Sequence, residues 1–343
     1  MSSNLMQKLD IYLSEETCHQ IELDALSFEI FKKNGQINRN KLLRMLIDGY
    51  YDEYDTSVKR KRNTVESCLL KVNLSEGNIQ ELTDDIMRNV VLTQIPSGRT
   101  YKSQKISLKP SKDMSTIMKR IKSNVISPDS LSMYLNRMIS SYCSLPFYHR
   151  EQILFKDNYI LLKDCCKTET PIIFGTTWDP ESIHEVIPYR VITGKEELYN
   201  YLLCAENNSK TGKQETKAYR LNRIINIKQV AVDYIIEDKV RTHLDEMVHM
   251  HIQYVINDDE EICVKLNDKG VRSFRNIFFG RPDVHRIEKK NGCFYYYFLG
   301  SSEQVFFYFR RFGKSAEVIS PLSLRKRFEI FHAETADIYR NND

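Results

Sequence analysis

The chain has 343 residues, and its 50 lysine and arginine side chains against 46 aspartate and glutamate side chains give a formal net charge of +4 at pH 7. This length is sufficient for two or three domains, and a hydrophobic content of 41% can supply each domain with a core. The mildly basic balance permits a nucleic-acid partner without requiring one. Local clusters of basic residues must therefore decide the question.

Several classes of protein are disfavoured by what the sequence lacks. No apolar run approaches the roughly 18 residues of a membrane-spanning helix, and residues 1–4 lack the basic and then apolar pattern of a secretory signal. We therefore expect a cytoplasmic protein with no membrane partner. The eight cysteines are scattered except for the adjacent Cys165 and Cys166, away from the spacing of zinc or redox motifs, which predicts reduced thiols.

Motifs of the common catalytic sites are also missing. The sequence has no glycine-rich phosphate loop, no nucleophile elbow and no zinc-protease motif. His249 and His251 have no carboxylate or cysteine at a matched spacing that would complete a zinc site. We therefore expect a protein that is not an enzyme and that needs no cofactor and no metal.

The same pattern occurs twice within the first 150 residues. Residues 7–11 and 104–108 alternate polar and apolar side chains, which predicts a half-buried strand in each copy. Each strand leads into two helices, and apolar residues of the second helix recur at i, i+3, i+4 and i+7, one face of an α-helix. These matched positions are Leu43, Leu46, Ile47 and Tyr50 in the first copy, and Leu135, Met138, Ile139 and Tyr142 in the second. Asn38 and Ser130 precede them where N-cap residues are expected.

A strand followed by two helices cannot bury its own apolar face, so the two copies are expected to pair. Both resemble the ribbon-helix-helix family, in which two units pair their strands and present the ribbon to DNA. The resemblance implies a pseudo-dimer within one chain over residues 1–150, with strands 7–13 and 104–110 antiparallel. The outward ribbon residues would be Lys8, Asp10, Tyr12, Lys105, Ser107 and Lys109. The alternative is two amphipathic helical hairpins, each preceded by a chance strand.

The segment between the two copies carries a basic run at residues 59–62 and a helical pattern over 79–90 that ends before Pro96. Such a run predicts either a solvated helix face or a contact with a nucleic-acid backbone. Secondary candidates for nucleic-acid binding are therefore Lys8, Lys105, Lys59 and Arg60. After the second copy, residues 151–170 are predicted to form a linker helix that ends at a domain boundary.

From residue 171 the pattern changes to short strands, predicted over 171–174, 186–191, 197–203 and 218–224. Pro188 with Arg190, the pair Tyr201-Leu202 and the run 219–224 are similar to the WYL domain family. Asn200 and Asn222 stand where that family has tryptophan and aspartate. The resemblance implies a small SH3/Sm-like β-barrel over residues 171–235.

The basic and aromatic residues of this segment are the predicted nucleic-acid site: His184, Arg190, Tyr201, Arg220 and Arg223. Guanidinium groups bind phosphate through two hydrogen bonds at once, and an aromatic ring stacks on an unpaired base. No nucleophile is paired with a base among them. The pattern therefore predicts a nucleotide-binding surface rather than an active site. In the alternative interpretation, these arginines are only solvent-exposed side chains on a sheet face and bind no ligand.

The last hundred residues are predicted to contain a strand over 248–256, a helix around Phe274, a hairpin of 284–287 with 293–298, and an aromatic helix ended by Gly313. Residues 313–325 are similar to the end of the WYL C-terminal extension. The resemblance implies an α/β extension over residues 236–343 that mediates a homodimer. The predicted fold class of the whole chain is α+β.

Two ribbon-helix-helix units ahead of a WYL domain and its extension resemble the accessory WYL proteins of type VI-D CRISPR systems. The resemblance implies a non-catalytic homodimer that binds single-stranded RNA and stimulates an RNA-guided, RNA-targeting CRISPR effector nuclease. The alternative is a DNA-binding transcriptional regulator, whose WYL domain senses a nucleotide and whose ribbon binds duplex DNA. Asp10 on the ribbon and the modest net charge favour RNA.

Overall fold

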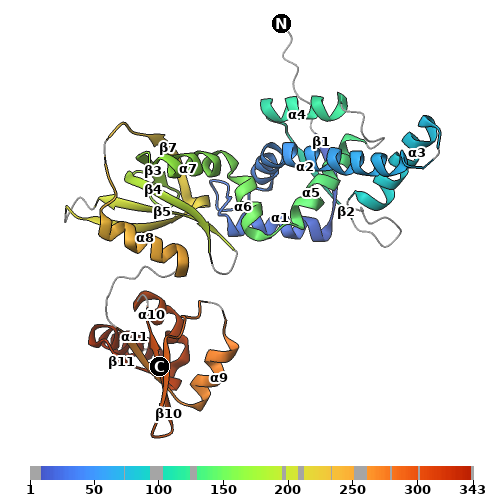
Figure 1. Ribbon diagram of the computed structural model, residues 1–343. Helices are drawn as coiled ribbons and strands as arrows, with labels where there is room; N and C mark the ends of the chain where they lie inside the picture. The colour runs from blue at the N-terminus through green and yellow to red at the C-terminus, as the bar shows by residue number, and fades with distance from the viewer. Residues whose placement is uncertain are drawn as a thin grey trace. The chain divides into compact units, whose positions relative to one another are not determined.

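The computed structural model describes residues 9–72, 74–92, 103–123, 130–194, 198–207, 212–232, 234–250, 261–278, 280–299 and 302–340. They form an α+β fold, as predicted, in two compact units that comprise residues 1–160 and 161–343 (Figure 1). No helix among the described residues is both long enough and apolar enough to cross a lipid bilayer.

The first unit contains mostly helices around one pair of strands. In chain order its elements are β1 (Leu9–Ser14), α1 (Glu15–Ser27), α2 (Arg39–Leu69), α3 (Glu76–Ile86), a π-helical turn (Met87–Val91), β2 (Ser103–Leu108), α4 (Lys112–Ser123), α5 (Leu131–Cys143), α6 (Phe147–Leu154) and the start of α7 (Lys156–Thr168). β1 and β2 pair antiparallel with Tyr12 opposite Lys105, so the predicted pairing of these strands within one chain is confirmed. Ile11, Leu13, Ile106 and Leu108 point into the core.

The helix faces matched by the sequence repeat are both buried. Side chains at the matched positions are at most 5% exposed: Leu43, Leu46, Ile47, Tyr50, Leu135, Met138, Ile139 and Tyr142. Both predicted N-caps are confirmed, because Asn38 accepts a hydrogen bond from the Lys41 amide at 3.1 Å and Ser130 accepts one from the Met133 amide at 3.3 Å. The two copies therefore share one core.

A buried ion pair joins three helices of this core. Asp24 of α1 is fully buried, and Arg150 of α6 donates to its two carboxylate oxygens at 2.8 and 3.0 Å. The hydroxyl of Tyr142 in α5 donates to the same carboxylate at 2.9 Å, and burial raises the pKa of this tyrosine well above its ordinary value. A buried charge is tolerated only when it is paired and hydrogen-bonded. The cluster therefore fixes α6 against α1 and α5.

The second unit begins with a five-stranded antiparallel sheet. Its elements are β3 (Ile172–Thr176), β4 (His184–Thr193), β5 (Asn200–Asn207), β6 (Gln214–Arg220), a 3₁₀ turn (Leu221–Arg223), β7 (Ile224–Gln229) and α8 (Asp238–Met250). The strand order is β6-β5-β4-β3-β7. The sequence predicted one strand over 218–224, but β6 ends at Arg220 and the 3₁₀ turn redirects the chain into β7.

α8 corrects two predictions from the sequence. Apolar residues before and along α8, Ile236, Val240, Leu244 and Met247, pack against Ile187, Leu203 and Ala205 of the sheet. This helix, which the sequence analysis assigned to the C-terminal extension, therefore belongs with the sheet. The predicted strand over 248–256 is wrong for residues 248–250, because they form the last turn of α8. Residues 251–256 lie outside the described part of the chain.

The remainder of the second unit is a smaller α/β arrangement. Its elements are β8 (Ile262–Leu266), α9 (Asp268–Asn276), β9 (Arg286–Lys290), β10 (Cys293–Phe298), α10 (Ser302–Phe309), a 3₁₀ segment (Arg310–Ser315), β11 (Ala316–Ser320) and α11 (Leu322–Arg340). The strand order is β11-β8-β10-β9. The hairpin turn predicted between β9 and β10 is confirmed, since Asn291 and Gly292 both have positive φ, as a two-residue hairpin loop requires.

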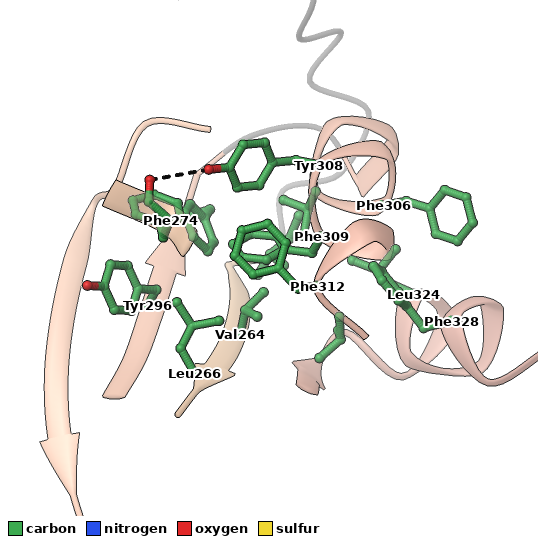
Figure 2. Packing of buried hydrophobic residues seen from close by; sticks show 14 of the residues in the cluster. Val264, Leu266, Phe274, Tyr296, Phe306, Tyr308, Phe309, Phe312, Leu324 and Phe328 are labelled. Atoms are coloured by element: carbon green, nitrogen blue, oxygen red, sulfur yellow. Dashed lines mark hydrogen bonds between the residues drawn. The ribbon is translucent and has the colours of Figure 1, made fainter. Parts of the chain in front are cut away.

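Aromatic side chains fill the core of this part (Figure 2). Phe306, Tyr308 and Phe309 of α10 are buried, and the Tyr308 hydroxyl donates to the Ile277 carbonyl oxygen at 2.7 Å. Phe307 is 50% exposed. The aromatic run of α10 is therefore mainly a core element, with one residue left on the surface.

We predict that Gly49→Ala destabilises the first unit. Gly49 of α2 is buried against α6, and an added Cβ would overlap the carbonyl oxygen of Ile153. Overpacking of this kind costs about 1–3 kcal/mol, which urea unfolding measures directly. Gly77→Ala in α3 is the matched control, because open space surrounds that glycine. Alanine should there raise the stability by up to about 1 kcal/mol through helix propensity. Equal stability of Gly49→Ala and the parent would contradict the packing described.

Candidate nucleic-acid interface

β5 runs through the sheet that carries the predicted site, and its side chains alternate between two faces. Tyr201 lies opposite Ile192 of β4 and Arg220 of β6, whereas Leu202 lies opposite Val191 and Tyr219. Directly opposite residues share a face. We call the face of Leu203 and Ala205, which α8 covers, the helix face. The other face, that of Leu202, Cys204 and Glu206, is called the histidine face because it contains His184.

Arg220 lies at one end of the helix face between two tyrosines. Its guanidinium carbon lies 4.1 Å from the ring centre of Tyr199 and 5.9 Å from that of Tyr201. Its Nε donates to the Tyr201 hydroxyl at 3.3 Å. These cation–π and hydrogen-bond contacts orient the planar guanidinium before any ligand arrives. Arg220 and Tyr201 are both half-buried, so the group is held in place and still reaches the surface.

Tyr199 is a member of this cluster that the sequence analysis missed. A usable signal was present, because Tyr199 and Tyr201 are separated by two positions, the repeat of a strand. Residues separated in this way point to the same face. The Tyr-x-Tyr spacing could therefore have indicated two rings beside one arginine.

Arg190 lies farther along the helix face, at a β-bulge. The bulge falls between Pro188 and Arg190 of β4, and it places Arg190 opposite Leu203. The Arg190 side chain is exposed, with its guanidinium carbon 5.7 Å from the ring centre of Tyr189. The Tyr189 hydroxyl in turn donates to Asp245 of α8. By register, Arg190 therefore shares a face with Tyr201 and Arg220.

His184 lies on the opposite face from these residues. Its Nδ1 lies 2.9 Å from a carboxylate oxygen of Glu206, and the Tyr219 hydroxyl donates to the other oxygen at 2.7 Å. The Nε2 atom of His184 is buried and has no hydrogen-bond partner among the residues that the structure describes. Burial, and next the bond to Glu206, raise the pKa of Tyr219. Neither nitrogen of His184 is presented to a phosphate, so the structure does not bring it together with Arg220.

Arg223 occupies the 3₁₀ turn after β6 rather than the strand position predicted for it. Its carbonyl oxygen accepts a hydrogen bond from the Thr177 amide at 2.9 Å, which joins the turn to the loop between β3 and β4. Leu221 and Asn222 of the turn are buried, whereas Arg223 is half-buried. The turn interrupts the two-residue alternation of the strand. The face on which Arg223 lies therefore does not follow from the face of Tyr219.

Charges on the β1–β2 ribbon are paired within the protein. Lys105 forms an ion pair with Asp10 at 2.7 Å, and the Ser107 hydroxyl donates to the same carboxylate at 2.5 Å. The bond to Asp10 raises the pKa of Lys105. Lys8, the other ribbon candidate, lies outside the described residues. A phosphate that approached Lys105 would therefore meet a neighbouring carboxylate.

The basic run of α2 lies on the helix surface. Lys59 forms an ion pair with Asp55 at 2.8 Å, and this hydrogen bond raises the pKa of the lysine. Arg60 is exposed. Of these two secondary candidates, Lys59 has its charge offset by Asp55, whereas the charge of Arg60 is not offset by that residue.

No group of at least three histidine, cysteine, aspartate or glutamate side chains among the described residues could hold a metal ion. Burial raises the pKa of the Cys143 and Cys166 thiols to about 12, so these thiols carry little thiolate at neutral pH. The arrangement is suited to binding through guanidinium groups and aromatic rings.

Comparisons with known proteins identify the fold. No protein-family model matches this chain, and a search of curated proteins finds no match. Among solved structures, the chain is similar to a CRISPR Cas-related protein, with a TM-score of 0.68 and 20% sequence identity over 99% of this chain and 96% of that one. A second structure, the Proteasome accessory factor B/C (PafBC) of Arthrobacter aurescens, has a TM-score of 0.23 and 16% identity over 49% of this chain and 25% of that one. The resemblance to a CRISPR-associated protein, predicted from the sequence, is therefore confirmed at the level of the fold.

We predict that removing a hydroxyl group has different effects on the two sheet faces. Tyr219→Phe deletes the donor to the half-buried Glu206 carboxylate. Because hydrogen bonds to charged groups contribute about 1.5–3 kcal/mol, the variant should be less stable by about that amount in urea unfolding. Tyr201→Phe is the matched control. It removes a longer bond, at 3.3 Å, from a guanidinium that reaches the surface and can bind water instead, so it should cost less than Tyr219→Phe, at most about 1.5 kcal/mol. A Tyr201→Phe variant that is destabilised more than Tyr219→Phe would contradict this assignment.

Proposed function

We propose that this protein, which shares its fold with a CRISPR Cas-related protein, is a non-catalytic accessory protein of a CRISPR system. It binds single-stranded RNA through its five-stranded sheet and stimulates an RNA-guided, RNA-targeting nuclease. The observation that carries the proposal is the Arg220 guanidinium held between Tyr199 and Tyr201. The similarity of fold to the CRISPR Cas-related protein, which covers 99% of this chain, supports a role in a CRISPR system.

The chemistry of this cluster supports RNA as its ligand. A guanidinium fork matches the oxygens of a phosphate, and tyrosine rings can stack on unpaired bases. Arg190 extends the same face and remains exposed. A single strand offers phosphates and accessible bases together, whereas the bases of a duplex are stacked on one another. No two of these side chains are arranged as a nucleophile with its general base, which supports a binding role without catalysis.

The proposal includes a family assignment for each part of the chain. We assign residues 1–150 to two ribbon-helix-helix units, supported by the β1–β2 pairing and the matched buried helix faces, and residues 151–170 to the linker. We assign residues 171–250 to a WYL domain of the SH3/Sm-like barrel type. Its last strand, β7, lies beside its first, β3, and a 3₁₀ turn precedes that last strand, as in barrels of this type. The remaining residues form the C-terminal extension.

The ribbon supplies the reason to prefer RNA over duplex DNA. A transcriptional regulator of the ribbon-helix-helix type would insert β1 and β2 into the major groove. Here Asp10 stands on the outward face, paired with Lys105 and hydrogen-bonded by Ser107. Bringing this carboxylate near DNA phosphates is unfavourable. The ribbon charge therefore disfavours the regulator as the second candidate.

We predict that Arg220→Ala, Arg223→Ala and Arg190→Ala each weaken the binding of single-stranded RNA. Removing one phosphate-binding charge should flatten the dependence of log affinity on log salt concentration by about 0.7. Fluorescence anisotropy of a labelled RNA at several salt concentrations measures both effects. Lys59→Ala and Lys105→Ala are the controls in the first unit and should change affinity little. A folded Arg220→Ala/Arg223→Ala variant that binds like the parent, while Lys59→Ala or Lys105→Ala abolishes binding, would place the site in the first unit.

We also propose that the protein is a homodimer through its C-terminal extension. Large apolar side chains are exposed on α10 and α11, including Phe307 at 50%, Leu322 at 78% and Ile338 at 62%. Exposed apolar surface of this kind often marks an interface. Phe307→Asp should therefore yield monomers in light scattering. Leu26→Asp, at a position of α1 that is 56% exposed, should remain dimeric. A dimeric Phe307→Asp variant would contradict the proposed interface.

A further inference from the structure

Trp178 is the single tryptophan of the sequence, and its side chain lies at the surface. It is in the loop between β3 and β4 and is 64% exposed. Tryptophan is normally highly buried, because its large indole ring contributes much apolar surface to a core. An exposed indole on a loop of this kind leaves one ring face open, and a flat ligand could cover that face.

The loop that carries Trp178 is held by its own hydrogen bonds. The Ser182 amide donates to the Asp179 carboxylate at 3.3 Å, and the Thr176 hydroxyl donates to the Asp179 carbonyl oxygen at 3.4 Å. The Thr177 amide donates to the carbonyl oxygen of Arg223 at 2.9 Å. The position of the indole is therefore set before binding, which reduces the entropic cost of ordering a ligand against it.

Aromatic side chains lie beside and behind the indole. The ring centre of Trp178 lies 6.4 Å from that of His184, and His184 stacks on Phe174 at 5.5 Å. Glu206 and Tyr219 hold His184 in place through its Nδ1 atom. The histidine predicted from the sequence to contact nucleic acid thus lies next to the exposed indole, held by contacts within the sheet.

The charges around the loop indicate which part of a nucleotide would lie here. Asp179 and Glu181 are acidic, so the loop is a poor site for a phosphate. Stacking on an indole requires only the face of a base, and every base has one. The bond from the Thr177 amide joins the loop to the turn that contains Arg223, a residue that the sequence predicts to bind phosphate. An indole beside that turn favours an unpaired base of RNA as its ligand, since a nucleotide carries a base and a phosphate at a fixed spacing.

We propose that Trp178 is a stacking platform for an unpaired base of single-stranded RNA, an inference that rests on the proposed function and adds a base contact beside His184, apart from the Arg220 cluster. Because no other indole is present, stacking of a base on Trp178 should quench the whole tryptophan fluorescence of the protein. Trp178→Ala should weaken RNA binding about 5- to 150-fold, the equivalent of one stacked base. The dependence of affinity on salt should stay unchanged, because the substitution leaves every phosphate-binding charge in place.

The test uses the full chain and two separate readouts. Anisotropy of an end-labelled oligouridylate reports binding, and tryptophan fluorescence reports what happens at Trp178. An abasic oligonucleotide of the same length should bind more weakly and leave the fluorescence unquenched. Ile183→Ala is the matched control on the same loop, because Ile183 is 71% exposed and apolar but has no aromatic face. It should bind RNA within about twofold of the parent, whereas Trp178→Phe should keep most of the affinity that Trp178→Ala forfeits.

The outcomes separate this inference from the function on which it rests. RNA that binds by anisotropy without quenching, together with a Trp178→Ala variant of parental affinity, overturns the platform and leaves RNA binding in place. Trp178 would then be free to contact a protein partner. If Ile183→Ala weakens binding as much as Trp178→Ala, the loop acts as an apolar surface and stacking is also overturned. If the protein binds no RNA by anisotropy, both the platform and the proposed function are contradicted.

Discussion

The alternation of side chains along β5 determines which residues lie together on each face of the five-stranded sheet. With a period of two residues, each position of the strand is committed to one face of the sheet. Tyr201 is therefore placed with Arg220 beside the helix-covered face, and Glu206 with His184 on the other. A shift of one residue in the pairing would exchange these sets. The division into an arginine cluster and an internal histidine network follows from this register.

The two faces use similar residue types for different purposes. On the histidine face, Tyr219 and His184 satisfy the Glu206 carboxylate, which stabilises the sheet. At the end of the helix face, Tyr199 and Tyr201 orient Arg220 without neutralising it. The ribbon shows a third case, in which Asp10 offsets the charge of Lys105. Exposed ion pairs of this type contribute little to stability, so the main effect of the Asp10 pair is on the surface charge.

Features set by local periodicity were predictable from the sequence. The matched helix faces follow from spacing alone, and so do the two N-caps and the outward positions of Asp10 and Tyr12. The family resemblance located Arg190, Arg220 and Tyr201 within one sheet, and Arg223 in the turn that follows β6. Each of these predictions depends on residues close together in the chain.

Features set by pairing between distant segments were not predictable in the same way. The bulge before Arg190 and the 3₁₀ turn at 221–223 break the alternation from which the faces were counted, and neither has a strong local signal. The sequence analysis placed residues 236–250 in the C-terminal extension and predicted no helix there, whereas α8 packs on the five-stranded sheet. Trp178 received no role from the sequence, since its exposure follows from how the loop is held against Arg223.

The central claim is that this protein recognises single-stranded RNA rather than duplex DNA. The most direct measurement compares the affinity of the full-length protein for a single-stranded RNA and for a duplex DNA of the same sequence and length, each at two salt concentrations. The account predicts that RNA binds more tightly at both concentrations and that log affinity falls with log salt by about 0.7 for each phosphate bound. Tighter binding of the duplex, or RNA binding that does not depend on salt, would contradict it.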